Sequence, residues 1–145
     1  MALSSLLALA LAAAAPADGT EGCFDVSEPD NSLSFTGKLV DRVFPGPPNY
    51  RSVARGDKPE RTLILEMSAS ICITDGGQMA DPKRKFDTIH LYAPNDLAPI
   101  LAAAKGRVVT VTGSGFPEHT GHHHAPLVLE VKEITVVAEE AQIAG

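Results

Sequence analysis

A mainly β fold is predicted by two features of the chain. Five segments show the alternation of apolar and polar residues, or the β-branched content, that is typical of strands, and turn-forming residues separate them. A short helical segment falls between the third and the fourth of these strands. This element order is that of a small five-stranded OB-like Greek-key barrel with one short helix between strands 3 and 4. We expect this barrel to occupy residues 32–137.

Residues 1–17 predict a secretory signal peptide. The segment is almost wholly apolar and small, and it is shorter than the about 20 residues that cross a bilayer comfortably. Ala15, Pro16 and Ala17 give a small-x-small pattern, with cleavage expected before Asp18. No Lys or Arg precedes the apolar block, which is unusual for a signal, and a membrane anchor is the alternative. We therefore expect a periplasmic or secreted protein with no membrane span after signal removal.

The two cysteines, Cys23 and Cys72, predict a disulfide. In an oxidising compartment an even pair of cysteines is typically bonded. The bond would tether the N-terminal segment, residues 18–31, to the middle of the chain. It closes a loop of about 50 residues, which the chain-entropy model values at about 4 kcal/mol. Free thiols that bind a metal are the alternative, although the sequence has no CxxC motif.

The strands before the helix are recognised by their period of two. They are predicted at residues 33–44, 62–67 and 86–92, with a short edge piece at 71–73. Gly37 within the first strand suggests a bulge or a bend. In the third strand Ile89 and Leu91 point to one face and His90 points to the other.

The helix and the last two strands complete the predicted barrel. Asp96 is expected to cap the helix, Pro99 falls in its first turn, and Gly106 follows its end, which gives about ten helical residues. β-branched residues predict strands at 107–112 and 127–137. Residues 138–145 are expected to form a flexible tail.

The connection between the first and second predicted strands is unusual, and we name it the Pro/Arg loop (residues 44–60). It begins F-P-G-P-P-N-Y, and its prolines exclude regular structure. Tyr50, Arg51, Arg55 and Asp57 follow, and basic residues outnumber acidic ones although the chain carries a net charge of −6. Long structured loops of this kind are often functional.

The connection between the fourth and fifth predicted strands is the His loop (residues 115–126). It reads G-F-P-E-H-T-G-H-H-H-A-P and holds four of the five histidines. In OB-folds, ligands lie across strands 2 and 3, between the loop that joins strands 1 and 2 and the loop that joins strands 4 and 5. Because these two loops are the Pro/Arg loop and the His loop, we expect both at one end of the barrel, with Tyr50 close to His122.

The two loops also carry a resemblance to a known family. The motifs are F-P-G-P-P-N-Y at 44–50, G-D-K-P-E at 56–60 and H-T-G-H-H-H-A-P at 119–126. Over residues 35–134 the chain resembles an uncharacterised family of short exported bacterial proteins, catalogued as a domain of unknown function. The resemblance implies a small exported β-rich bacterial protein, and it implies no activity, substrate or catalytic residue.

The composition of the two loops predicts a non-catalytic binding module, with an anionic small ligand, a glycan or an exported protein as its partner. Arg42, Arg51, Arg55 and Arg61 could bind acidic groups through forked contacts, and aromatic rings could stack on a sugar or a base. The acidic net charge argues against nucleic acid, and we expect a monomer. The candidate ligand-binding residues are Tyr50, Arg51, Arg55, Asp57, Phe116, His119, His122 and His124.

Three alternatives remain open from the residues alone. In the first, His119, His122 and His124 bind Zn or Cu, because three imidazoles are a plausible ligand set; otherwise no cofactor is expected. In the second, the histidines only lock the two loops together by hydrogen bonds and by packing against Tyr50. In the third, the protein is a hydrolase of unknown class, although no G-x-S-x-G or H-E-x-x-H motif is present and no catalytic residue is assigned.

Overall fold

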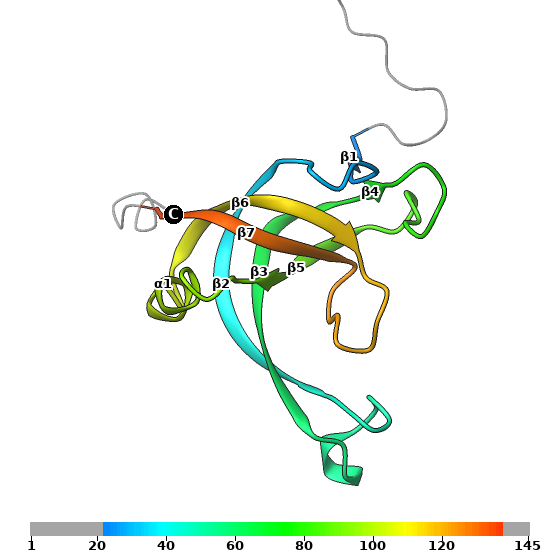
Figure 1. The fold of residues 1–145 in the computed structure, drawn as a ribbon, viewed down its shortest axis with the longest axis vertical. Coiled ribbons are helices and arrows are strands. Elements are labelled where there is room, and N and C mark those ends of the chain that lie inside the picture. The colour runs from blue at the N-terminus through cyan, green and yellow to red at the C-terminus, as the bar shows by residue number, and fades with distance from the viewer. Residues whose placement is uncertain (1–21, 138–145) are drawn as a thin grey trace, which may run out of the picture.

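The computed structural model describes residues 22–137 (Figure 1). The predicted signal peptide at 1–17 and the predicted flexible tail at 138–145 lie outside the described residues. Within the described range no helix is long and apolar enough to cross a membrane.

Five strands form a closed barrel, as the sequence predicts. They follow one another round the barrel in the order β2-β3-β5-β7-β6, and β6 pairs back with β2. Neighbouring strands are antiparallel except β5 and β7, which are parallel. The bounds are β2 (Leu33–Pro45), β3 (Pro59–Ile71), β5 (Phe86–Tyr92), β6 (Val108–Pro117) and β7 (Leu127–Val136). The helix α1 (Ala98–Ala103) lies between β5 and β6, so the mainly β class is confirmed and the order is consistent with an OB-like barrel.

The barrel interior is filled by alternate residues of all five strands. Leu39, Leu65, Val111 and Leu129 are fully buried at its centre, each from a different strand. On β5, Ile89 and Leu91 point inward and His90 points outward, as predicted. Every strand therefore keeps an outward face that is available for the loops to cover.

Two glycines allow strands to approach closely. A Cβ on Gly37 would collide with the carbonyl oxygen of Glu66, and one on Gly113 would collide with that of Glu130. Gly37 lies where β2 leaves β6 and begins to pair with β3, since the next residue, Lys38, pairs with both. The bend expected at Gly37 therefore corresponds to the point where β2 changes partner.

The N-terminal segment is held to the barrel as the cysteine pair predicts. Cys23 and Cys72 form a disulfide. Directly beside it, β1 (Phe24–Asp25) pairs with β4 (Ile73–Thr74) in a small parallel sheet. The ring of Phe24 packs edge-on against Phe35 of the barrel core, with 4.9 Å between ring centroids.

The helix differs from the prediction at its start. It has six residues instead of about ten, and Leu97 occupies the cap position without a side-chain hydrogen bond. The backbone N–H groups of Leu97 and Ala98 both bond to the carbonyl of Pro94, so Asp96 lies inside a preceding turn. The expectation that Asp96 caps the helix is therefore wrong, whereas Gly106 takes the left-handed conformation expected after the helix, with φ of 82°.

Two strands are longer than their sequence patterns indicate. β6 continues to Pro117, and β3 begins at Pro59 and ends at Ile71. Residues 113–117 have little strand propensity, but they pair with residues 127–131 of β7, so tertiary pairing overrides local preference. Figure 1 shows β2 and β3 continuing beyond the barrel as a long hairpin that carries the Pro/Arg loop at its tip.

Candidate functional site

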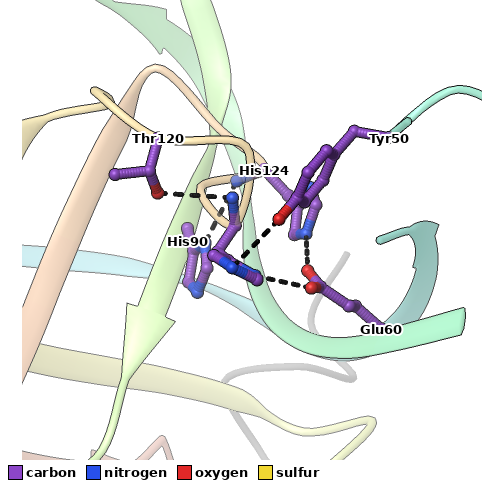
Figure 2. A network of polar contacts seen from close by, with 6 residues as sticks. Tyr50, Glu60, His90, Thr120 and His124 are labelled. Atoms are coloured by element: carbon purple, nitrogen blue, oxygen red, sulfur yellow. Dashed lines mark hydrogen bonds and ion pairs between the residues drawn. The ribbon is translucent and has the colours of Figure 1, made fainter. Parts of the chain in front are cut away.

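The Pro/Arg loop and the His loop meet, as expected. The phenol oxygen of Tyr50 lies 3.1 Å from Nε2 of His122, which is 72 residues further along the chain. The two rings meet edge to face, with 5.3 Å between centroids. Figure 2 shows Tyr50 and Glu60 approaching the histidines from the side of the Pro/Arg loop.

Asp57 organises the Pro/Arg loop from within. Its carboxylate is buried and accepts backbone N–H groups from Asn49, Arg51 and Ser52 at 2.9, 2.8 and 2.9 Å. These bonds, that of Ser52 foremost, hold the pKa of Asp57 below its usual value. Asp57 was expected to contact a ligand, but the structure places its carboxylate inside the loop as a structural group.

The loop presents Tyr50 in an unusual backbone conformation. Tyr50 has φ of 57°, in the left-handed region that non-glycine residues seldom adopt. Its N–H donates to the carbonyl of Gly46 at 2.9 Å, so the loop closes around it. The ring lies against Gly121, where an added Cβ would come within 2.9 Å of it. Gly121 thus leaves the space that lets the Tyr50 ring reach the His loop.

Glu60 joins two histidines of the His loop to the start of β3. Its Oε1 lies 2.5 Å from Nδ1 of His122, and its Oε2 lies 2.8 Å from Nε2 of His124. A carboxylate only accepts hydrogen bonds, so Nδ1 of His122 and Nε2 of His124 each carry a proton. Burial of Glu60 raises its pKa, but the bonds from His124 and His122 outweigh burial and lower it overall. Glu60 is not among the residues expected at the site, and its only sequence signal is its place at the end of the G-D-K-P-E motif.

His124 is held between two rings. Its ring is parallel to that of Phe44, with 4.4 Å between centroids, and parallel to that of His90 at 5.9 Å. The backbone N–H of His124 donates to Nδ1 of His90 at 3.1 Å. His90 was not among the expected site residues, although its outward position on the third strand was recognised.

The rest of the His loop is held by its own ring nitrogens. Nδ1 of His123 accepts the backbone N–H groups of His119 and Thr120 at 3.0 and 3.3 Å. Nδ1 of His119 donates to the carbonyl of Pro117 at 3.2 Å. The rings of His119 and His123 both pack against Phe116 of β6, with centroids 5.5 and 5.4 Å away.

This arrangement does not fit the alternative of a Zn or Cu site. Both ring nitrogens of His122 are engaged, by Glu60 and by Tyr50, and Nε2 of His124 is engaged by Glu60. His119 instead packs with His123 and bonds to its own loop. In residues 22–137 no three His, Cys, Asp or Glu side chains converge in a way that could hold a metal ion. The geometry matches the alternative in which the histidines lock the two loops together.

Of the four arginines expected to bind acidic groups, two are paired with carboxylates of the chain itself. Arg42 pairs with Glu66 at 3.0 Å and Arg61 pairs with Asp41 at 3.1 Å. Arg51 and Arg55 are exposed on the Pro/Arg loop, and the latter ends the 3-10 turn η1 (Val53–Arg55). Among the described residues neither guanidinium has a carboxylate partner.

An open pocket of about 370 Å³ lies beside the His loop. We name it the His90 pocket. The residues that line it are His90, Tyr92, Phe116, His122, His123, Val128 and Glu130. Of the expected ligand-binding residues, Phe116 and His122 lie here. The pocket lies on β5, β6 and β7. The backbone N–H of His124 donates to Nδ1 of His90, so the His loop lies over the outer face of β5. The expectation that a ligand lies across β3 and β5 stays a prediction.

The fold and the site define a small closed β-barrel protein in which an imidazole–carboxylate cluster joins two loops. A family model described as "Domain of unknown function (DUF4431)" matches residues 88–135, which run from β5 into β7 and include the whole His loop. Over those residues the chain is therefore similar to an uncharacterised family, as the resemblance implies. The motifs at 44–50 and 56–60 lie outside the matched residues. No curated protein matches the chain.

Proposed function

We propose that the protein is an exported, non-catalytic binding module in which the Pro/Arg loop and the His loop form one site. The observation that carries this proposal is the junction of Tyr50 and Glu60 with His122 and His124. The junction fixes two protruding loops relative to each other, so they lose little conformational entropy when a ligand binds. The disulfide is consistent with an exported protein.

Arg51 and Arg55 favour a ligand with an acidic group, such as an anionic glycan. Guanidinium groups without an internal carboxylate partner are available for forked contacts to a carboxylate or a phosphate. The backbone N–H of Arg51 donates to the carboxylate of Asp57, and that of Arg55 donates to the carbonyl of Ser52, so the loop presents both residues in a defined place. An acidic face of a protein partner is the alternative occupant.

The test is a titration with oligogalacturonate as the anionic probe, followed by calorimetry at two salt concentrations. Binding that weakens with salt is expected in the natural protein and should be lost in an Arg51→Ala/Arg55→Ala variant. A Lys38→Ala/Lys132→Ala variant removes the same charge from exposed positions on β2 and β7 and serves as the control. Equal loss in both variants would show that only net charge matters and would contradict a site on the loops.

One observation favours a second candidate function, a hydrolase of unknown class. Glu60, His122 and Tyr50 are connected as carboxylate to Nδ1 and Nε2 to hydroxyl, which is the connectivity that activates hydroxyl nucleophiles. With p-nitrophenyl acetate as the probe, this candidate predicts turnover that Tyr50→Phe abolishes and Arg51→Ala leaves unchanged. Turnover that does not depend on Tyr50 would reject it.

A further inference from the structure

The His90 pocket has an apolar floor on the outside of the barrel. Val128 of β7 pairs with His90 of β5 on one side and with Phe116 of β6 on the other, so these three side chains form a row across three strands. Val128 points away from the barrel core and is nevertheless only 2% exposed. The rings around it therefore shield it and shape a depression above it.

The rim of the pocket combines an aromatic ring with a carboxylate. Tyr92 and Glu130 pair across β5 and β7 and lie in the row next to that of His90 and Val128. Tyr92 is 57% exposed, which is high for a large aromatic side chain on a strand. An exposed ring beside a pocket can stack on the flat face of a ligand.

Two of the histidines that line this pocket carry a neutral ring N–H group. Nδ1 of His90 accepts the N–H of His124, and Nδ1 of His123 accepts those of His119 and Thr120. A ring nitrogen that accepts a backbone N–H carries no proton, so in each neutral ring the proton is on Nε2. Burial, aided by neighbouring histidines, lowers the pKa of His90 to about 4, and burial also lowers the pKa of His123. Both rings are therefore neutral donors near pH 7.

The charges around the pocket exclude the simplest charged ligands. None of the described residues that line it is Lys or Arg, and Glu130 supplies a negative charge, so an isolated anion is disfavoured. A simple ammonium ion has only donors, and it could not accept the N–H groups of His90 and His123. A ligand with hydroxyl groups can accept from the two imidazoles and donate to Glu130 at the same time.

We propose that the His90 pocket binds a neutral sugar ring, with its C–H face on Tyr92 and Phe116 and its hydroxyl groups toward His90, His123 and Glu130. The volume of about 370 Å³ lies at the small end of the range for ligand pockets and suits a single ring. The proposal rests on the binding function proposed above and names the part of a glycan that the pocket takes. A nucleobase could stack in the same way, but the net charge of −6 disfavours polymeric nucleic acid.

The experiment is a chemical-shift titration of the isotope-labelled protein. The probes are the neutral trisaccharides maltotriose, cellotriose and chitotriose, together with trigalacturonate, adenosine and choline as comparisons. We expect at least one neutral trisaccharide to shift the amides of residues 90–92 and 128–130. In Tyr92→Ala its affinity should fall about tenfold, the loss that one aromatic contact can cause.

Matched variants separate this proposal from the binding function itself. Glu130→Gln should weaken the sugar, because an acceptor carboxylate is lost, whereas Ile100→Ala, an exposed apolar residue on α1, should not. Urea unfolding of each variant checks that it is folded. If trigalacturonate binds through Arg51 and Arg55 while no neutral sugar shifts the pocket, the binding function stands and the sugar proposal is overturned. Pocket shifts caused only by choline or adenosine, or unchanged sugar affinity in both Tyr92→Ala and Glu130→Gln, also overturn it.

Discussion

Glu60 is the residue on which the junction of the two loops depends. It is the shared acceptor of His122 and His124, and its side chain is 21% exposed. Glu60, the last residue of the Pro/Arg loop, thus ties the hairpin of β2 and β3 to the His loop between β6 and β7. The Tyr50 hydroxyl adds a second, more exposed contact to the same imidazole.

Replacing Glu60 by Gln tests this role. The amide has one acceptor oxygen and turns an N–H₂ donor toward the other imidazole N–H, so one of the two bonds is lost. We expect the free energy of unfolding to fall by about 1.5–3 kcal/mol, as for a hydrogen bond to a charged group. Urea unfolding at pH 7 measures it, with Glu133→Gln on the exposed face of β7 as the control. A loss no larger than that of the control would mean that the loops do not depend on Glu60.

His90 is expected to make the stability of the protein depend on pH. Its pKa is lowered from 6.5 to about 4, chiefly by burial, so the unfolded chain binds a proton first as the pH falls. Stability should therefore decrease from about pH 6.5 toward pH 4. The pKa of Glu60 is lowered from its ordinary value of 4.5, so Glu60 adds a further loss of stability only when the pH falls below about that value.

The measurement is the free energy of unfolding in urea at pH 7 and at pH 5. We expect a decrease of about 1 kcal/mol from His90 between these values, since its partial exposure reduces the effect through solvent screening. His90→Asn keeps an acceptor for the N–H of His124 but does not titrate, so its decrease should be smaller. An equal decrease in the variant would assign the pH dependence to other groups, such as His123.

Among the elements, the antiparallel pairing of β6 with β7, which we name the β6–β7 seam, explains how the His loop is placed. The strands pair from Val109 to Pro117, with a register shift between Thr112 and Gly113. At that point Gly113 approaches the carbonyl oxygen of Glu130 so closely that no Cβ would fit. The pairing beyond Gly113 carries β6 to Pro117 and leaves a short loop that turns back onto β5.

Gly113→Ala should therefore open this seam. Because the neighbour is backbone and cannot move aside alone, we expect a loss of about 2–4 kcal/mol in unfolding free energy. Thr112→Ala, on the same strand, removes only a side-chain bond to Ser34 at 3.0 Å and should cost less than about 1 kcal/mol. Thermal unfolding of both variants distinguishes them, and similar stabilities would show that the seam tolerates a side chain.

At the scale of the whole molecule, the disulfide holds the N-terminal segment to a barrel that closes without it. The five barrel strands pair round the full ring, whereas β1 pairs only with β4. The bond spans 49 residues of chain. Its contribution is therefore expected to be one of stability, with the barrel and the two loops left in place after reduction.

Reduction with dithiothreitol should lower the free energy of unfolding by about 4 kcal/mol in the chain-entropy model. A Cys23→Ser/Cys72→Ser variant should show the lower stability with or without reductant. The contact between Tyr50 and His122 should persist in both forms, which nuclear Overhauser effects between the two rings can verify. Stability that reduction leaves unchanged would contradict the stabilising role of the disulfide.

The local pattern predicted the interior of the strands better than the ends of the strands and of the helix. The alternation around Ile89 and Leu91 placed both in the core and His90 outside, because side-chain direction in a strand depends only on neighbouring positions. The ends were less predictable: Gly115 and Pro117 are strand residues because β7 pairs with them, and Asp96 does not cap the helix because the preceding turn uses its position.

The class of fold, the cysteine pair and the meeting of the two loops could be predicted from the amino-acid sequence alone. These follow from the period of two, from the number of cysteines and from the element order, all of which are local or countable. The folded arrangement was needed to show that Glu60 binds His122 and His124, that Asp57 turns inward, and that His90 and Tyr92 border a pocket. Glu60 and His124 are separated by 64 residues, and the closure and register of the barrel, which no local pattern encodes, bring their side chains together.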